Sequence, residues 1–269
     1  MVKRVGQLFD LVSPDYDNVG IDFFGPIAEL LVLEVAPKPG ESVLDLGCGS
    51  GAATVRLADA VGLNGAVTGL DVSPMMLKRA QLAVGDRTRA DWIVGDASDP
   101  DVGERLFDAV TASLVIFFLP YPAAAMRRWA SLVRPGGRVA ATTFGDSTTE
   151  WAAAERELRP YLPGPDPRKS GTASPFASDA GVEALFSQAG LVAVSSTTLR
   201  VEVEFEDIEH FVRWSRSIGQ RIAWELMPAD AVPTTIEAMR RHLAPITDEL
   251  GRIRVWQDVR CTLGVRPLA

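Results

Sequence analysis

Cysteine and histidine are scarce in this chain of 269 residues, and it has no long apolar run. The cysteines are Cys48 and Cys261, and the histidines are His210 and His242. Their spacing fits neither a metal site nor a disulfide framework, so we expect no metal and a reducing environment. The longest apolar run, residues 112–119, is too short to cross a bilayer, which argues against a membrane protein.

The charge balance and the first residues of the sequence narrow the function classes further. The net charge is −8 and no cluster of Lys and Arg is evident, which disfavours a nucleic-acid partner. No signal peptide is visible in the first residues. We therefore expect a cytoplasmic protein whose partner is a small molecule, neither a membrane nor a nucleic acid. The oligomeric state stays open.

What the chain does contain is a glycine turn between an apolar strand and a helix. Residues 43–51 read VLDLGCGSG, with glycines at Gly47, Gly49 and Gly51, and Asp71 ends the next apolar run 20 residues later. Glycines there allow a tight turn and close approach of the backbone, and an acid at this spacing binds ribose hydroxyls. The pattern predicts a site for a cofactor that contains adenosine.

The glycines alone do not exclude NAD, because Gly47, Gly49 and Ala52 also satisfy the looser dinucleotide pattern. Asp45 favours another cofactor. Its carboxylate, two residues before Gly47, would face the doubly charged pyrophosphate of a dinucleotide, which is unfavourable in a partly dry site. S-adenosylmethionine (SAM) has no phosphate and carries a sulfonium and an ammonium group, which suit Asp45. The structural alternative is that Asp45 only caps the turn.

Five motifs in order extend the pattern. They read VLDLGCGSG at 43–51, VTGLDVSPMML at 67–77, VGDA at 94–97, FDAV at 107–110 and LVRPGGR at 132–138. With these motifs the chain resembles the class I SAM-dependent methyltransferases, particularly the small-molecule group that includes the ubiquinone/menaquinone C-methyltransferases. The resemblance covers about residues 40–145, and the C-terminal half matches only in outline.

Alternating strands and helices up to residue 143 predict an α/β fold with a doubly wound, Rossmann-like parallel sheet. The resemblance implies seven strands, with the last two forming an antiparallel edge hairpin. We expect an N-terminal helical lid at 1–41 and a SAM-binding core at 42–269. Substrate-cap insertions are expected at about 147–178 and 206–250, the second of them inside the edge hairpin.

The resemblance also assigns roles in cofactor binding. Asp71 binds the ribose hydroxyls, Val72 and Met76 flank the adenine, and the edge of the adenine meets Asp96 and Ala97. The methionine amine meets the backbone of Ser113 and Leu114, and Tyr16 folds over SAM. Four of them have a structural alternative: a helix-entry acid for Asp71, a core position for Met76, an Asx turn for Asp96 and a surface turn for Tyr16.

Aromatic residues cluster in the segments near the predicted pocket: Phe23, Phe24, Phe117, Phe118, Phe144, Trp151, Trp214 and Trp224. Core packing explains most of them, and the rest are candidates to line an apolar substrate site. The substrate-binding candidates that we select are Phe23, Phe117, Phe118, Trp151 and Trp214. His210 is the one candidate general base with a suitable intrinsic pKa, although a solvated helix histidine is the alternative.

Methyl transfer from SAM to a small, apolar metabolite is the predicted function. The sulfonium is a good electrophile, so the protein mainly aligns the acceptor and excludes water. An oxygen, nitrogen or carbon acceptor is therefore compatible with the sequence. Two alternatives stay open: a SAM-binding protein that transfers no methyl group, with either cyclisation chemistry or a structural SAM site, and an NAD-dependent oxidoreductase.

Overall fold

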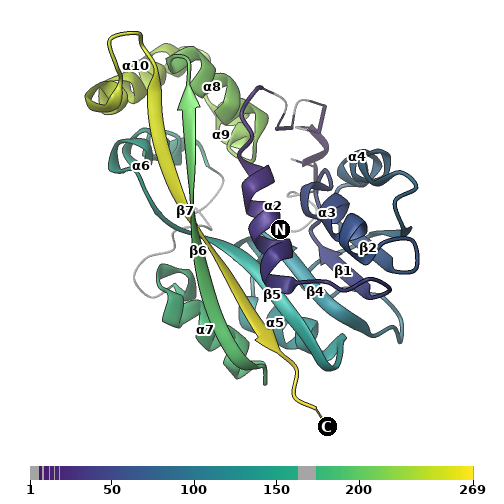
Figure 1. The fold of residues 1–269 in the computed structure, drawn as a ribbon. Coiled ribbons are helices and arrows are strands. Elements are labelled where there is room, and N and C mark those ends of the chain that lie inside the picture. Colours follow the sequence, from purple (N-terminus) through teal and green to yellow (C-terminus); the bar gives the residue numbers. More distant parts are fainter. Residues whose placement is uncertain are drawn as a thin grey trace.

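The computed structural model describes residues 6–7, 9–11, 13–14, 16–17, 19–162 and 174–268. Its seven strands form one sheet in the order β3-β2-β1-β4-β5-β7-β6 (Figure 1). The strands are β1 (Ser42–Leu46), β2 (Ala66–Asp71), β3 (Arg89–Val94), β4 (Phe107–Ser113), β5 (Val133–Ser147), β6 (Val192–Phe205) and β7 (Ile253–Val265). The order and the pairing confirm the predicted doubly wound, seven-stranded α/β fold.

The first five strands are parallel, and only β7 and β6 run antiparallel to their neighbours. Helices follow the strands and cover both faces of the sheet. They are α2 (Phe24–Val35), α3 (Ala52–Val61), α4 (Pro74–Val84), α5 (Pro122–Ser131) and α7 (Asp179–Gln188). Because β1 and β4 are adjacent and their chains then lead outward in opposite directions, their carboxyl ends form the switch point where such sheets bind ligands.

The local sequence sets where helix α4 begins, close to the switch point of the sheet. Ser73 precedes it and its hydroxyl accepts the N–H of Met76 at 3.0 Å, while Pro74 occupies the first helical position. Both features are typical of helix N-termini. The helix therefore begins directly after Asp71, the last residue of β2.

Between β6 and β7 the chain leaves the sheet and forms α8 (Ile208–Ser217), α9 (Arg221–Leu226) and α10 (Ala231–Leu243). Helix α6 (Thr149–Arg156), which follows β5, packs against α10 at the same end of the molecule (Figure 1). We call α6 and α8–α10 the cap. The expected insertion at 206–250 thus coincides with three helices, whereas residues 163–173 of the insertion expected at 147–178 lie outside the described residues. The boundaries and the substrate role of the lid and cap stay predictions.

A chain of buried hydrogen bonds holds the cap together. The indole N–H of Trp224 donates to the Ser215 hydroxyl at 2.8 Å, and this hydroxyl donates to Gln220 Oε1 at 2.6 Å. Gln220 Nε2 and Trp151 Nε1 both donate to Glu155 Oε1, the latter at 3.1 Å. Helices α6, α8 and α9 are therefore linked by polar contacts as well as by packing. Among the described residues, no helix combines the length and apolar character needed to cross a membrane.

Candidate active site

Asp45 lies buried at the end of β1 and is only 1% exposed. Its Oδ2 accepts the hydroxyl of Thr54 at 2.7 Å, and its Oδ1 accepts that of Thr111 at 2.9 Å. Burial raises the pKa of Asp45 to about 6, although the two threonine hydroxyls oppose the shift. The carboxylate therefore stands beneath the glycine turn, within the field of Asp71, rather than at an open lip. Its predicted role toward the cationic cofactor stays a prediction.

The three turn glycines have different surroundings, although their sequence pattern treats them alike. A Cβ at Gly47 would lie 2.5 Å from Val115, and one at Gly51 would lie 2.9 Å from the Cα of Ala80. Gly49 has φ +54°, and a Cβ there would meet nothing within 4 Å. Gly47 and Gly51 are thus needed for packing within the protein, while Gly49 alone borders open space, as a residue facing a ligand does.

Asp71 connects this turn to the end of β2. Its Oδ2 accepts the N–H of Gly49 at 2.8 Å, and its Oδ1 accepts the N–H of Ser73 at 2.8 Å. Burial raises the pKa of Asp71, against the effect of these backbone hydrogen bonds. Each carboxylate oxygen can accept more than one hydrogen bond, so both keep the capacity to bind a hydroxyl. The geometry fits the predicted contact with two ribose hydroxyls.

Two of the residues that we predicted to bind the adenosine part of SAM, Tyr16 and Val72, lie near Asp71. Tyr16 stacks on Phe24 with ring centroids 5.4 Å apart, and burial followed by the charges of Asp17 and Asp71 raises the pKa of Tyr16. Val72 is half-buried, and a Cβ on Gly6 would lie 3.0 Å from its carbonyl oxygen. Gly6 therefore lies against the residue that follows β2. The N-terminal lid and the fold of Tyr16 over SAM stay predictions.

Three other adenine candidates have structural partners. Met76 is only 1% exposed, which agrees with the core alternative. Asp96 accepts the N–H of Ser98 at 2.8 Å, and this is the Asx turn that formed its alternative. Ala97 is buried and its carbonyl accepts the indole N–H of Trp129 at 2.7 Å. Their contacts with adenine stay predictions.

A threonine that the sequence reasoning missed organises the end of β4. The hydroxyl of Thr142, on the neighbouring β5, accepts the N–H of Leu114 at 2.9 Å and lies 3.3 Å from the Ser113 hydroxyl. Leu114 has φ +56°, a conformation that is uncommon outside glycine and often found at functional sites. The Leu114 N–H is already bound to Thr142. An ammonium group needs hydrogen-bond acceptors, and the backbone carbonyl groups at this strand end can provide them.

The five aromatic substrate candidates do come together. Phe23 lies 5.5 Å from Trp214 and 6.2 Å from Trp151 between ring centroids, and Phe117 lies 4.7 Å from Phe118. Phe144 joins the two groups, at 6.5 Å from Phe23 and 5.4 Å from Phe117. We call these six residues the aromatic cluster: Phe23, Phe117, Phe118, Phe144, Trp151 and Trp214. It connects α2, the carboxyl end of the sheet and the cap, so its position agrees with the predicted substrate site.

Two buried polar side-chain atoms of the described residues have no hydrogen-bond partner, Asp17 Oδ1 and Trp214 Nε1. Burial, helped by the charge of Asp22, raises the pKa of Asp17 to about 7, while Arg79 opposes the shift. The carboxylate oxygen of Asp17 can accept a hydrogen bond, and the indole N–H of Trp214 can donate one. Unpartnered buried polar groups are rare in folded proteins and are expected where a ligand completes the site.

His210 does not have the surroundings of a general base. It is 6% exposed; its Nδ1 accepts the N–H of Glu206 at 3.3 Å, and its Nε2 lies 2.8 Å from the carbonyl oxygen of Val19. A carbonyl requires a donor, so Nε2 carries the proton and Nδ1 uses its lone pair. Neither nitrogen is free for a substrate proton, and our general-base interpretation conflicts with this geometry. The histidine instead ties α8 of the cap to the N-terminal region.

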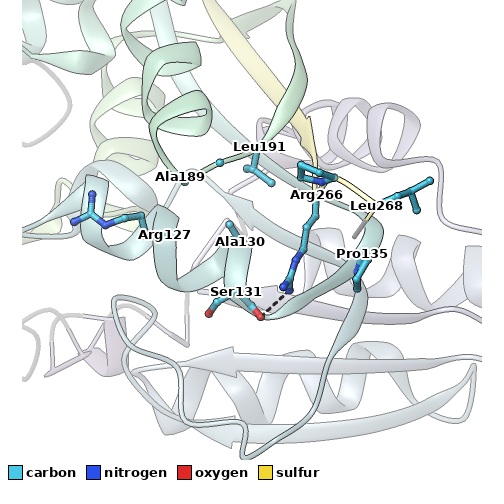
Figure 2. A pocket seen from close by; sticks show the side chains of 10 residues that line it. Arg127, Ala130, Ser131, Pro135, Ala189, Leu191, Arg266 and Leu268 are labelled. Atoms are coloured by element: carbon cyan, nitrogen blue, oxygen red, sulfur yellow. Dashed lines mark hydrogen bonds between the residues drawn. The ribbon is translucent and has the colours of Figure 1, made fainter.

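A cavity of about 380 Å³ lies elsewhere in the molecule. Figure 2 shows the side chains that line it. It is lined by Arg127 and Ser131 of α5, by Leu191 before β6, and by Arg266 and Leu268 after β7. Arg266 is already occupied, because its Nη1 donates to the Ser131 carbonyl at 3.2 Å. Since β5 and β6 begin here, the cavity lies at the opposite end of the sheet from the glycine turn. Within the described ranges, no group of three or more His, Cys, Asp or Glu side chains is placed to hold a metal ion.

Comparison with known sequences agrees with this site. The methyltransferase domain family matches residues 43–137. Nocamycin O-methyltransferase of Saccharothrix syringae is 32% identical over 238 residues, which cover 83% of this chain and 85% of that protein. Aklanonic acid methyltransferase DauC of Streptomyces sp. (strain C5) is 39% identical over 60% of this chain and 74% of its own length. A demethylmenaquinone methyltransferase of Lysinibacillus sphaericus is 32% identical, over 51% and 60%.

Solved structures share the fold at lower identity. The YcgJ protein of Bacillus subtilis superimposes with a TM-score of 0.60 at 17% identity, covering 91% of this chain and 99% of that one. The [4+2]-cyclase SpnF gives 0.55 at 16% identity, covering 100% and 98%. The fold is thus found in a cyclase too, and the sequence relatives decide the family. The chain belongs to the class I SAM-dependent methyltransferases that act on small molecules, and its cofactor is SAM.

Proposed function

We propose that the protein transfers the methyl group of SAM to an oxygen of a small aromatic metabolite held by the aromatic cluster. The observation that carries the proposal is the cluster itself, which lies between the carboxyl end of the sheet and the cap. A relative that covers 83% of this chain is named nocamycin O-methyltransferase, and this supports oxygen as the accepting atom. Two other relatives are named for aklanonic acid and for demethylmenaquinone, which supports a small-molecule acceptor.

The residues at the glycine turn fit SAM. Gly49 borders open space, and the two acids Asp45 and Asp71 give the site negative charge, which suits a cation and disfavours a pyrophosphate. SAM, when bound, supplies an electrophilic methyl group on a sulfonium centre. In this proposal Asp71 binds the ribose hydroxyls, and the carbonyl groups at the end of β4 accept the ammonium group. Buried Asp45 stabilises the positive charge without direct contact.

Positioning is the main catalytic device in this proposal. The ring faces of Phe23, Phe117 and Trp214 hold a planar acceptor and exclude water from the reacting atoms. Trp214 Nε1 donates to an oxygen of the acceptor, and Asp17 Oδ1 accepts a hydrogen bond or a proton from its hydroxyl. Val19, two residues after Asp17, is held by His210, and Trp214 follows His210 by one helical turn on α8. The two unpartnered atoms thus belong to the same contact region between α8 and the N-terminal residues.

Transfer of label from [methyl-³H]SAM tests the proposal, with 1-hydroxy-2-naphthoic acid, reduced 1,4-naphthoquinone and an aromatic amine as acceptors. We expect label in the oxygen acceptors, together with one S-adenosylhomocysteine (SAH) for each methyl group transferred. Loss of the label in mild alkali identifies an ester, and retention identifies an ether. Label only in the amine or on carbon would contradict an oxygen acceptor. Turnover of an acceptor without any SAH would instead support chemistry without methyl transfer.

A further inference from the structure

The N-terminal residues are fastened to helix α4 by one side chain. Arg79, half-buried on α4, donates to the carbonyl oxygens of Ser13, Pro14 (3.0 Å) and Tyr16 (3.3 Å). All three contacts are made by the guanidinium, whose charged N–H groups form stronger hydrogen bonds than neutral donors. Replacing this single residue would therefore remove the hydrogen bonds of Ser13, Pro14 and Tyr16 to α4.

A second attachment lies at the beginning of the same helix. Asp10 Oδ1 accepts the Ser73 hydroxyl at 2.6 Å and the N–H of Met75 at 3.2 Å. Ser73 also donates its backbone N–H to Asp71, the residue that we assign to the ribose. The described N-terminal residues are thus anchored at two points, at the beginning of α4 beside that assigned contact and at Arg79 further along the helix.

The described N-terminal residues also contact aromatic side chains outside α4. Phe9 lies 6.2 Å from Phe118 and 6.1 Å from Tyr16 between ring centroids, and Tyr16 stacks on Phe24. The described residues from Phe9 to Tyr16 therefore connect α4 with α2 and with the aromatic cluster. The connection also lies beside Asp71, the residue that we assign to the ribose, because Asp10 of the same segment binds Ser73.

We propose that Arg79 is a positioning residue that holds the described residues 9–11, 13–14 and 16 closed over the adenosine end of SAM and thereby sets the rate at which SAM and SAH exchange. The proposal rests on the placement of SAM at Asp71 and adds a control on that site. Arg79 acts through the backbone of the segment and contacts no reacting atom. Since it binds carbonyl groups, its effect does not depend on the side chains of Ser13 or Pro14.

The test compares Arg79→Met with Arg87→Met in the full chain. Arg87 is the matched control, because it donates to the carbonyl groups of Ala83 (2.7 Å) and Val84 (2.8 Å) at the far end of α4 and has no hydrogen bond to the N-terminal residues that the structure describes. SAH dissociation is followed by stopped-flow competition with excess SAM. We expect Arg79→Met to release SAH about tenfold faster, the change that corresponds to ~1.4 kcal/mol. Arg87→Met is expected to match the wild type.

Hydrogen exchange separates a local opening from a general loss of structure. With SAH bound, the peptide covering residues 6–17 should lose protection in Arg79→Met while the peptides of β1 and β4 keep theirs. Arg79→Lys, which keeps the charge and one donor, should give an intermediate rate and also covers the case in which the methionine variant does not fold. Unchanged SAH release in Arg79→Met or Arg79→Lys would overturn the proposal, provided that Asp71→Ala weakens SAM binding. If Asp71→Ala binds SAM normally, it is the cofactor placement that is wrong.

Discussion

At the residue scale, the site is defined by two buried acids and by the hydrogen bonds that their carboxylates accept. Asp45 has threonine hydroxyls on both oxygens, and Asp71 has backbone N–H groups on both. Burial raises the pKa of each acid, so each is less readily ionised than in water. Such acids weaken the fold when charged and are expected where a cationic ligand restores the balance. Stability and cofactor binding should therefore respond in opposite directions when the charge at Asp45 is removed.

Asp45→Asn should make the protein more stable at pH 7 and bind SAM less tightly. The pKa of Asp45 is about 6 when folded, above its ordinary value of 3.8, so the folded state binds the extra proton and stability falls as pH rises from 3.8 to 6. Asp45→Asn cannot ionise, so its stability does not fall in this way. Its free energy of unfolding at pH 7 should exceed that of the wild type by on the order of 2 kcal/mol, since one pKa unit is worth about 1.4 kcal/mol. SAM affinity should drop about tenfold because a counter-charge is lost. Urea unfolding and calorimetry measure the two effects.

Asp108→Asn provides the control with the opposite sign. Burial is outweighed at Asp108 by hydrogen bonds from the Ser42 N–H and from Arg134, which lower the pKa of this carboxyl. The ionised Asp108 carboxylate therefore stabilises the fold at pH values above its ordinary pKa, and this stabilisation is lost as the pH falls and the group is protonated. Because asparagine cannot ionise, Asp108→Asn should be less stable than the wild type at pH 7. An Asp45→Asn protein that is destabilised at pH 7, or that binds SAM as the wild type does, would refute the electrostatic account.

At the element scale, the cap and the N-terminal residues form one connected cover over the carboxyl end of the sheet. His210 of α8 binds the carbonyl of Val19, and the chain of hydrogen bonds from Trp224 to Glu155 joins α8 and α9 to α6. The aromatic cluster lies where these elements meet the sheet. A ligand there would contact several elements at once, so their relative positions matter more than any single side chain.

His210→Ala should lower stability and leave the pH profile of methyl transfer unchanged. Two part-buried hydrogen bonds to backbone groups are lost, which should reduce the free energy of unfolding by about 1–3 kcal/mol. The rate with an acceptor that takes label should stay within a few-fold of the wild type from pH 6 to 9. His242→Gln is the control, because His242 is half-exposed and its partner is Glu157. A loss of about a hundredfold or more in rate, with disappearance of a titration near neutral pH, would restore His210 as a base.

At the scale of the whole molecule, the sequence predicted what local patterns encode. Residues 43–51 specify the end of β1 and the glycine turn, α3 begins at the next residue, and helices separate most of the strands from there to β5. The contacts that complete the site are of another kind. Thr111 and Thr142 bond to groups 66 and 28 positions away, and Arg79 to groups 63 to 66 positions away. A threonine or an arginine on a helix or strand has no local signature for such a partner.

The glycines illustrate the same limit. Their spacing revealed the turn, but it did not show that Gly47 packs on Val115 and Gly51 on α4, while Gly49 borders open space. The aromatic residues were predicted as candidates by composition and segment, and only the fold brought Phe23, which precedes α2, beside Trp214 of the cap. The central claim, that SAM binds against this turn, therefore depends most directly on Gly49.

Calorimetric titration of SAM into Gly49→Ala tests that claim, with Gly40→Ala as the matched control. Both glycines have a positive φ, +54° and +88°, and a Cβ at either would meet nothing within 4 Å, so each variant bears the strain of a left-handed residue, about 1 kcal/mol. Only the Cβ of residue 49 would enter the space assigned to SAM. We predict that Gly49→Ala binds SAM at least about tenfold more weakly while Gly40→Ala binds it as the wild type does. Equal SAM affinity in the two variants would contradict the account.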